Sequence, residues 1–206
     1  GALDLQGVIT VDLDGTTTQT ITNSGAGDFG DITISNTSAE VQLLSDLTVV
    51  DDITIAAGAI LDISGYNVTG TGSTTFANNG RIQLDGDQTF TNATPTNAAG
   101  SVIEYTATSG TRAINDWTYQ GLHINGPGGT FTLGANESVA ETFTAEAGTF
   151  DVNDLTFALN GDTVINGGTV ATGTNTVTFG NAGGDSVTIS GGELRIESDV
   201  PNTDIV

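Results

Sequence analysis

Cysteine, methionine and lysine are all missing from the 206 residues of this chain. Without cysteine, the chain has neither disulfides nor thiolate metal ligands. A secreted protein of this size without disulfides fits a bacterial or archaeal surface better than a small eukaryotic secreted domain. The start at Gly1 predicts a processed or excised piece of a longer protein. No apolar run approaches the roughly 20 residues that a membrane span requires, so direct membrane insertion is not expected.

Positive charge is also scarce. Three arginines, Arg81, Arg112 and Arg195, stand against 25 acidic residues, and the formal net charge is -22. Such a chain repels the phosphates of nucleic acids and the headgroups of anionic lipids, which makes both poor partners. It attracts cations instead, which suits an extracellular position, including a marine or saline setting.

What the sequence does contain is a regular alternation of apolar and polar residues, the period of a β-strand. The hydrophobic content of 36% and this regularity argue against disorder. Gly, Asn, Asp and Ser lie between the alternating stretches and are typical of turns. No helix-period segment of useful length is present, so the sequence predicts an all-β protein. The expected strands are 8–13, 31–35, 41–44, 47–50, 53–56, 60–63, 81–84, 102–105, 122–124, 130–133, 142–145, 149–152, 176–179, 186–189 and 193–196.

The alternation repeats after about ninety residues. The stretch "GAILDISGYNVTG" (58–70) returns as "GTFDVNDLTFALNG" (148–161), and the same offset aligns Val49 with Val139 and Ile53 with Phe143. The repeats cover approximately 11–90 and 103–179, with a third, partial copy from 185. A fixed period predicts a solenoid, a propeller or an array. The positions that stay apolar are predicted to face inward: Leu43, Val49, Ile53, Leu61, Ile63 and Val68, then Leu133, Val139, Phe143, Phe150, Val152 and Phe157.

Short strands joined by bends, rather than by two-residue hairpin loops, favour a parallel β-helix. We therefore predict a single right-handed β-solenoid over residues 1–206. Tandem β-sandwich domains are the alternative, because about ninety residues with seven strands also suit an immunoglobulin-like sandwich.

The stretch "SDLTVVDDITIAAGAILDISGYNVTGTGSTTFANNGRIQLDG" (45–86) resembles the β-solenoid repeats of large bacterial surface proteins, such as autotransporter passengers and filamentous-haemagglutinin-like exoproteins. The shared features are a short "LTV" strand, a "G-x-L-D-I/L" step and "G-Y-x-V/L-T". The resemblance implies a right-handed parallel β-helix with a role at the cell surface. It transfers no catalytic residue.

Reactive side chains are few, and no enzyme is expected. His123 is the only histidine. Its strand position points away from the apolar face, and acid–base catalysis needs an oriented partner. No Ser-His-Asp set can be proposed.

Paired acids are the stronger candidates for a site. Asp12 with Asp14, and Asp85 with Asp87, form two D-x-D pairs beside glycines, and strand residues two apart share a face. Each pair is a candidate calcium site. The alternative is diffuse cation binding driven by the net charge, and no cofactor is required by the sequence.

Trp117 is the candidate for an exposed platform that stacks on a surface polysaccharide; the alternative is a side chain that fills a gap. For assembly, the first alternating stretch is expected to pair with a neighbouring solenoid segment or another copy of the chain by strand addition. The residues concerned are Leu3, Leu5, Val8, Ile9, Val11 and Leu13.

These expectations favour an extracellular structural protein, a segment of a filament, sheath, surface layer or adhesin stalk. A carbohydrate-binding or adhesive module is the first alternative. A polysaccharide-active β-helix enzyme with an acidic cleft is the second.

Overall fold

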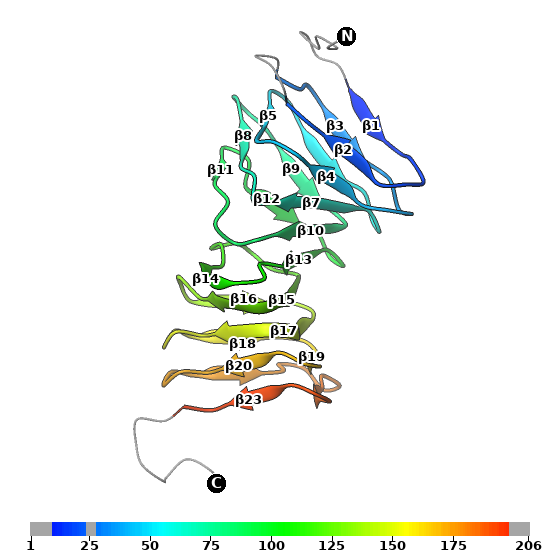
Figure 1. Cartoon of the computed structure of the whole chain (residues 1–206). Coiled ribbons are helices and arrows are strands. Elements are labelled where there is room, and N and C mark those ends of the chain that lie inside the picture. The colour runs from blue at the N-terminus through cyan, green and yellow to red at the C-terminus, as the bar shows by residue number, and fades with distance from the viewer. Residues whose placement is uncertain (1–9, 24–27, 198–206) are drawn as a thin grey trace. The chain divides into compact units, whose positions relative to one another are not determined.

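The computed structural model describes residues 10–23 and 28–197 (Figure 1). The described residues form strands and turns and no helix, and the strands stack in parallel as a β-solenoid of about nine turns. This confirms the predicted all-β parallel β-helix. The sandwich alternative is wrong, because an immunoglobulin-like sandwich pairs its strands in antiparallel order. No helix in the described part of the chain is long and apolar enough to cross a membrane.

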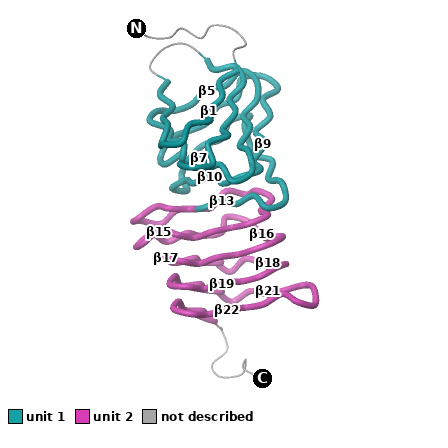
Figure 2. Tube along the Cα trace, turned by 90° about the vertical axis from the view of Figure 1, so that its right-hand side faces the viewer, with its two compact units in different colours: residues 1–104 teal, residues 105–206 magenta. Residues whose placement is uncertain are grey.

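The chain divides into two compact units, residues 1–104 and 105–206, coloured separately in Figure 2. Each unit is a stack of coils with three strand-bearing faces. The prediction of one continuous solenoid over residues 1–206 stays a prediction.

In unit 1 the three faces follow one another along each coil. The first face comprises β1 (Val11–Leu13), β3 (Ile32–Ile34), β6 (Ile53–Ile55), β9 (Phe76–Asn78) and β12 (Pro95–Asn97). The second comprises β2 (Gln19–Ile21), β4 (Val41–Leu43), β7 (Ile60–Ser64) and β10 (Arg81–Leu84). The third comprises β5 (Leu47–Val49), β8 (Val68–Gly70) and β11 (Phe90–Thr91). The strand β13 (Val102–Tyr105) spans the boundary between the units.

In unit 2, two of the faces share long strands that turn a corner. The strands that contribute to these two faces are β14 (Gly110–Ala113), β15 (Gly121–Thr132), β17 (Phe143–Asp151), β19 (Thr163–Ile165), β20 (Thr169–Ala171), β22 (Val187–Ile189) and β23 (Glu193–Arg195). The third face comprises β16 (Glu137–Val139), β18 (Phe157–Leu159) and β21 (Val177–Phe179).

The true repeating unit is one coil, which is much shorter than ninety residues. Val11 pairs with Ile32, 21 residues later, and the offset between paired strands ranges from 19 residues, Phe76 to Pro95, to 24 residues, Thr163 to Val187. The ninety-residue similarity therefore spans about four coils.

The core lies inside the coils. All twelve residues predicted to face inward are at most 1% exposed, which confirms that prediction. In unit 2, Phe143, Phe150 and Phe157 come from the three faces of one coil, and their ring centroids lie 5.0 to 5.4 Å apart. These distances are those of favourable aromatic pairs.

Glycine is required at the corner between the two long-stranded faces of unit 2. Gly148 has a φ of +82°, and a Cβ at this position would lie 2.3 Å from the carbonyl oxygen of Gly126 on the preceding coil. Both the backbone conformation and the close approach exclude a larger side chain. The corner thus lets successive coils stack at backbone distance.

Acidic and amide side chains tie one coil to the next at other corners. The residue directly before a strand accepts, through Oδ1, a hydrogen bond from the backbone N–H of the equivalent residue one coil later. These bonds join Asp31 to Asp52, Asp52 to Thr75, Asp46 to Asn67, Asn67 to Thr89, Asn136 to Thr156 and Asp162 to Ser186, at 2.8 to 3.2 Å. We call this set the corner acceptors. It gives four of the aspartates a structural role, because each one satisfies a backbone donor that its own strand leaves unpaired.

Candidate functional site

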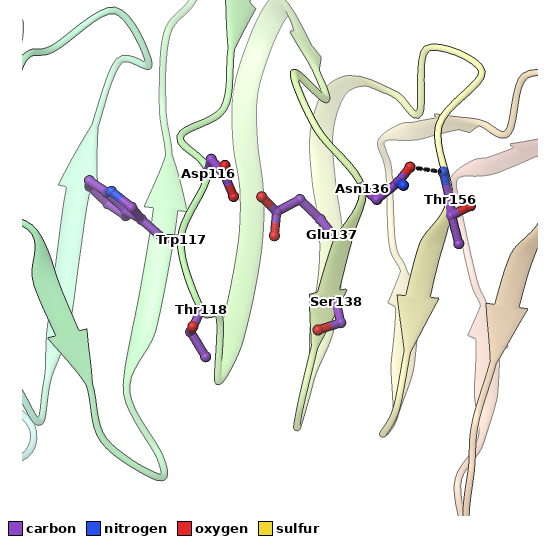
Figure 3. A pocket seen from close by; sticks show the side chains of 7 residues that line it. All are labelled: Asp116, Trp117, Thr118, Asn136, Glu137, Ser138 and Thr156. Carbon is purple, nitrogen blue, oxygen red and sulfur yellow. Dashed lines mark hydrogen bonds between the residues drawn. The ribbon is translucent and has the colours of Figure 1, made fainter.

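A pocket of about 390 Å³ opens on the third face of unit 2 (Figure 3). All its lining residues except Trp117 are polar or acidic: Asp116, Trp117, Thr118, Asn136, Glu137, Ser138 and Thr156. Residues 116–118 lead into Tyr119, which forms an isolated parallel bridge with Val139, so the lining residues come from successive coils at matching positions. Asn136, one of the corner acceptors, accepts a hydrogen bond at 2.9 Å from the backbone N–H of Thr156, which also lines the pocket.

Glu137 occupies a position that faces the core in the next coil. It is in register with Phe157, which is fully buried, and Phe157 is in register with Val177. Trp117 stands two residues before Tyr119, just as Glu137 stands two residues before Val139. The equivalent positions of four successive coils are therefore occupied by Trp117, Glu137, Phe157 and Val177, so that Glu137 is the one acid among large apolar side chains. A carboxyl group in such surroundings loses hydration that favours its charged form.

The carboxyl group of Glu137 interacts with the carboxyl group of Asp116, which replaces part of the lost hydration. The two side chains point toward one another in Figure 3. Burial, followed by the hydrogen bond to Asp116 and the charge of Asp116, raises the pKa of Glu137 to about 8, against a smaller lowering by the backbone N–H of Ser138. The oxygen Oε1 of Glu137 is shielded from solvent and makes no hydrogen bond within the described residues. At neutral pH, Glu137 is therefore protonated and can donate to Asp116.

Two buried tyrosines lie within electrostatic reach of this pair. The hydroxyl groups of Tyr105 and Tyr119 are 3.0 Å apart, and the backbone N–H of Asn115 donates to the hydroxyl of Tyr105 at 2.8 Å. The hydroxyl of Tyr119 donates to the carbonyl oxygen of Asn115. Burial is the main cause that raises the pKa of each tyrosine, and Glu137 adds to both shifts. Both phenols therefore stay neutral near pH 8.

The predicted platform, Trp117, does line the pocket, but it does not present an exposed ring. Trp117 is 9% exposed, and its indole extends away from Glu137 in Figure 3. This agrees with the gap-filling alternative for the ring and corrects the picture of a flat, exposed stacking surface. A role for Trp117 in ligand binding stays a prediction.

The two predicted calcium pairs lie elsewhere. Asp12 is exposed on β1 and accepts a hydrogen bond from the hydroxyl of Ser35 at 2.6 Å, and Asp14 is exposed beyond the end of β1. Asp85 and Asp87 follow the end of β10. Asp14, Asp85 and Asp87 thus lie just beyond the ends of their strands. No group of three or more potential metal-ligating side chains occurs among residues 10–23 and 28–197, and calcium binding stays a prediction.

The remaining residues singled out by the sequence are His123 and the predicted assembly residues. Nε2 of His123 lies 2.9 Å from Oε2 of Glu146, on the outer side of β15 and β17. Of the predicted assembly residues, Val11 and Leu13 lie in β1 and are half-buried. Leu3, Leu5, Val8 and Ile9 lie outside the described residues.

The comparisons with protein-family models, with curated proteins and with solved structures find no match to this chain. The class of the protein, a parallel β-solenoid, is therefore established by its own structure.

Proposed function

We propose that this chain is an extracellular structural segment, part of a filament, sheath, surface layer or adhesin stalk at a cell surface. The observation that carries the proposal is the use of its polar side chains between coils. The corner acceptors bind backbone donors of neighbouring coils, at 2.8 to 3.2 Å, instead of converging on a substrate. A stack in which each coil contacts its neighbours is a form suited to an extended support.

The last described strands support growth by strand addition. Ile189 is in register with the fully buried Ile165, yet it is 50% exposed, and Val187 is 47% exposed. A further coil placed on β22 would cover both side chains and pair with backbone groups of this strand. We propose that this coil comes from another copy of the chain or from a neighbouring solenoid segment.

Negative-stain electron microscopy of the purified chain tests the proposal. We expect rods longer than one chain, and deletion of residues 2–13, which removes all of β1, should shorten or abolish them. The substitution Asp12→Asn, which leaves β1 in place, should not. Strictly monomeric particles at high concentration would refute self-assembly, and rods unaffected by the deletion would refute assembly through residues 2–13.

Surface localisation is tested separately. An antibody raised against this chain should label intact, unpermeabilised cells that produce the full-length parent protein. Labelling only after permeabilisation would exclude an extracellular role, whatever the outcome of the microscopy.

Carbohydrate binding is the second candidate, and the pocket around Glu137 favours it. Hydroxyl groups of Thr118, Ser138 and Thr156 line this pocket together with an amide and two carboxyl groups. Such a lining can both donate to and accept from the hydroxyl groups of a saccharide. A glycan array with the wild-type chain and with Ser138→Ala should show a signal that the variant loses. An array without any signal would remove this candidate.

The enzyme alternative has less support from the same pocket. Glycosidases hold their two carboxyl groups at least about 5 Å apart so that the scissile bond or a water fits between them. The carboxyl groups of Asp116 and Glu137 instead point toward one another, and their interaction helps to raise the pKa of Glu137. We therefore propose a non-catalytic role.

A further inference from the structure

Asp116 and Glu137 lie on successive coils, so a change in their charge would affect how these coils pack. Glu137 begins β16, and its strand pairs with β18 through Glu137 to Phe157 and Val139 to Leu159. Asp116 approaches from the preceding coil. The contact between these two acids therefore bridges successive coils on the third face of unit 2.

We propose that Asp116 and Glu137 hold one proton between them, and that loss of this proton separates the two carboxyl groups and loosens the coil at β16. The pocket is thus a pH-sensitive point of the solenoid. While the proton is present, one carboxyl group donates to the other, and the pair carries a single negative charge. Once it is lost, the carboxylate of half-buried Glu137 faces that of Asp116, and like charges that face each other repel.

The titratable groups around Glu137 indicate that only one proton is lost from this pocket near pH 8. Asp116 is the acid that contacts it, and the buried hydroxyl groups of Tyr105 and Tyr119 are the other titratable groups that interact with it. Burial raises the pKa of each tyrosine above its ordinary value, so neither loses its proton before Glu137 does. No cationic side chain lines the pocket to stabilise a second negative charge.

The sign of the effect on stability follows from the direction of the shift. The pKa of Glu137 is raised in the folded protein, from an ordinary 4.5 to about 8, so the folded state binds this proton more tightly than the unfolded state. The contribution is fully present below pH 4.5 and is lost as the pH rises through about 8. Alkaline conditions should therefore weaken unit 2, starting at the third face.

Tryptophan fluorescence gives a direct readout, because Trp117 is the only tryptophan in the chain and lines this pocket. We expect the emission of the wild-type chain to change in one step with a midpoint near pH 8. In Glu137→Gln, which keeps a donor for Asp116 but cannot ionise, the step should vanish. In Asp116→Asn, which removes the neighbouring negative charge, the midpoint should move to lower pH.

Glu193→Gln is the matched control, because it removes one exposed negative charge from the same unit away from the pocket. It should leave the midpoint of the step unchanged. Urea unfolding adds a measurement of stability: the wild-type midpoint should fall between pH 6 and pH 9 by more than that of Glu137→Gln. A fluorescence step that persists unchanged in Glu137→Gln, or a wild-type chain without a step near pH 8, would overturn the proposal. If Glu137→Gln fails to fold by circular dichroism, the shift in Asp116→Asn decides.

Discussion

Oδ1 of Asp46 accepts a hydrogen bond from the backbone N–H of Asn67, at 2.9 Å, across one full coil of the solenoid. Asn67 repeats the arrangement with Thr89 at 2.8 Å. Each acceptor side chain lies directly before a strand and satisfies the donor that begins the next coil. A negative or amide side chain at this position therefore does for the solenoid what a capping residue does for a helix.

Removal of one corner acceptor should lower stability by a modest, measurable amount. Asp46→Ala leaves the N–H of Asn67 without its partner, which should cost about 1 kcal/mol of unfolding free energy. Asp46→Asn keeps an oxygen acceptor and should change the free energy much less. Urea unfolding of the three proteins measures this, and equal losses in both variants would show that charge, not the hydrogen bond, matters.

Acid should weaken the same type of contact. Hydrogen bonds from the hydroxyl and backbone N–H of Ser186 lower the pKa of Asp162 below its ordinary 3.8. A lowered folded-state pKa contributes stability that is present above the ordinary value and lost as the pH falls through the folded value. Between pH 5 and pH 2, Asp162→Asn should therefore lose less thermal stability than the wild type. An equal fall in melting temperature between pH 5 and pH 2 for both proteins would contradict this.

The aromatic cluster of unit 2 should dominate its core energetics. Phe143→Ala removes a ring that contacts both Phe150 and Phe157, and such truncations cost about 3 to 5 kcal/mol. Phe143→Leu keeps most of the volume and should cost less than about 1.5 kcal/mol. Chemical denaturation monitored by circular dichroism gives both values. Hydrogen exchange that finds this coil among the least protected would argue against the packing.

The glycine corner should not tolerate a side chain. Gly148→Ala would place a methyl group 2.3 Å from the Gly126 carbonyl at a positive φ, so adjacent coils must separate. We expect a clear loss of melting temperature. Gly134→Ala is the matched control, because a Cβ there has no neighbour within 4 Å and the residue is exposed. A harmless Gly148→Ala would show that the corner is looser than the structure indicates.

Cations should stabilise the fold by screening a net charge of -22. The melting temperature should rise with sodium chloride and rise further with millimolar calcium at matched ionic strength. A sharp gain at low calcium that Asp85→Asn or Asp12→Asn abolishes would indicate specific sites. Complete independence from salt would contradict both the screening and the calcium prediction.

The local pattern was sufficient for the residues inside the coil. Alternation identified Ile53 and Phe143 as inward-facing, and both are at most 1% exposed. The physical reason is that neighbouring side chains on a strand point to opposite faces, so a short stretch already tells the core side from the solvent side. The strand β12 (Pro95–Asn97) was missed, because it contains no large apolar residue and so lacks that signal.

One signal of the site was present in the ninety-residue alignment. That offset places Glu137 opposite Leu47, which is 1% exposed, so an acid stands where the other repeat has a core residue. The alignment could thus have singled out Glu137. It could not have found Asp116, since nothing in the sequence distinguishes this aspartate from the other acids.

The sequence by itself determined the β character, the inward side of most strands, the acidic surface and the existence of a repeat. Only the tertiary structure decided the length of a coil, and with it which residues meet. Glycines and polar residues at a bend are compatible both with a corner of a solenoid coil and with a reversal of the chain. The 21-residue step from Val11 to Ile32 is therefore known only from the pairing of the strands. The contact of Asp116 with Glu137 depends on that step, because stacking in register is what brings side chains from successive coils face to face.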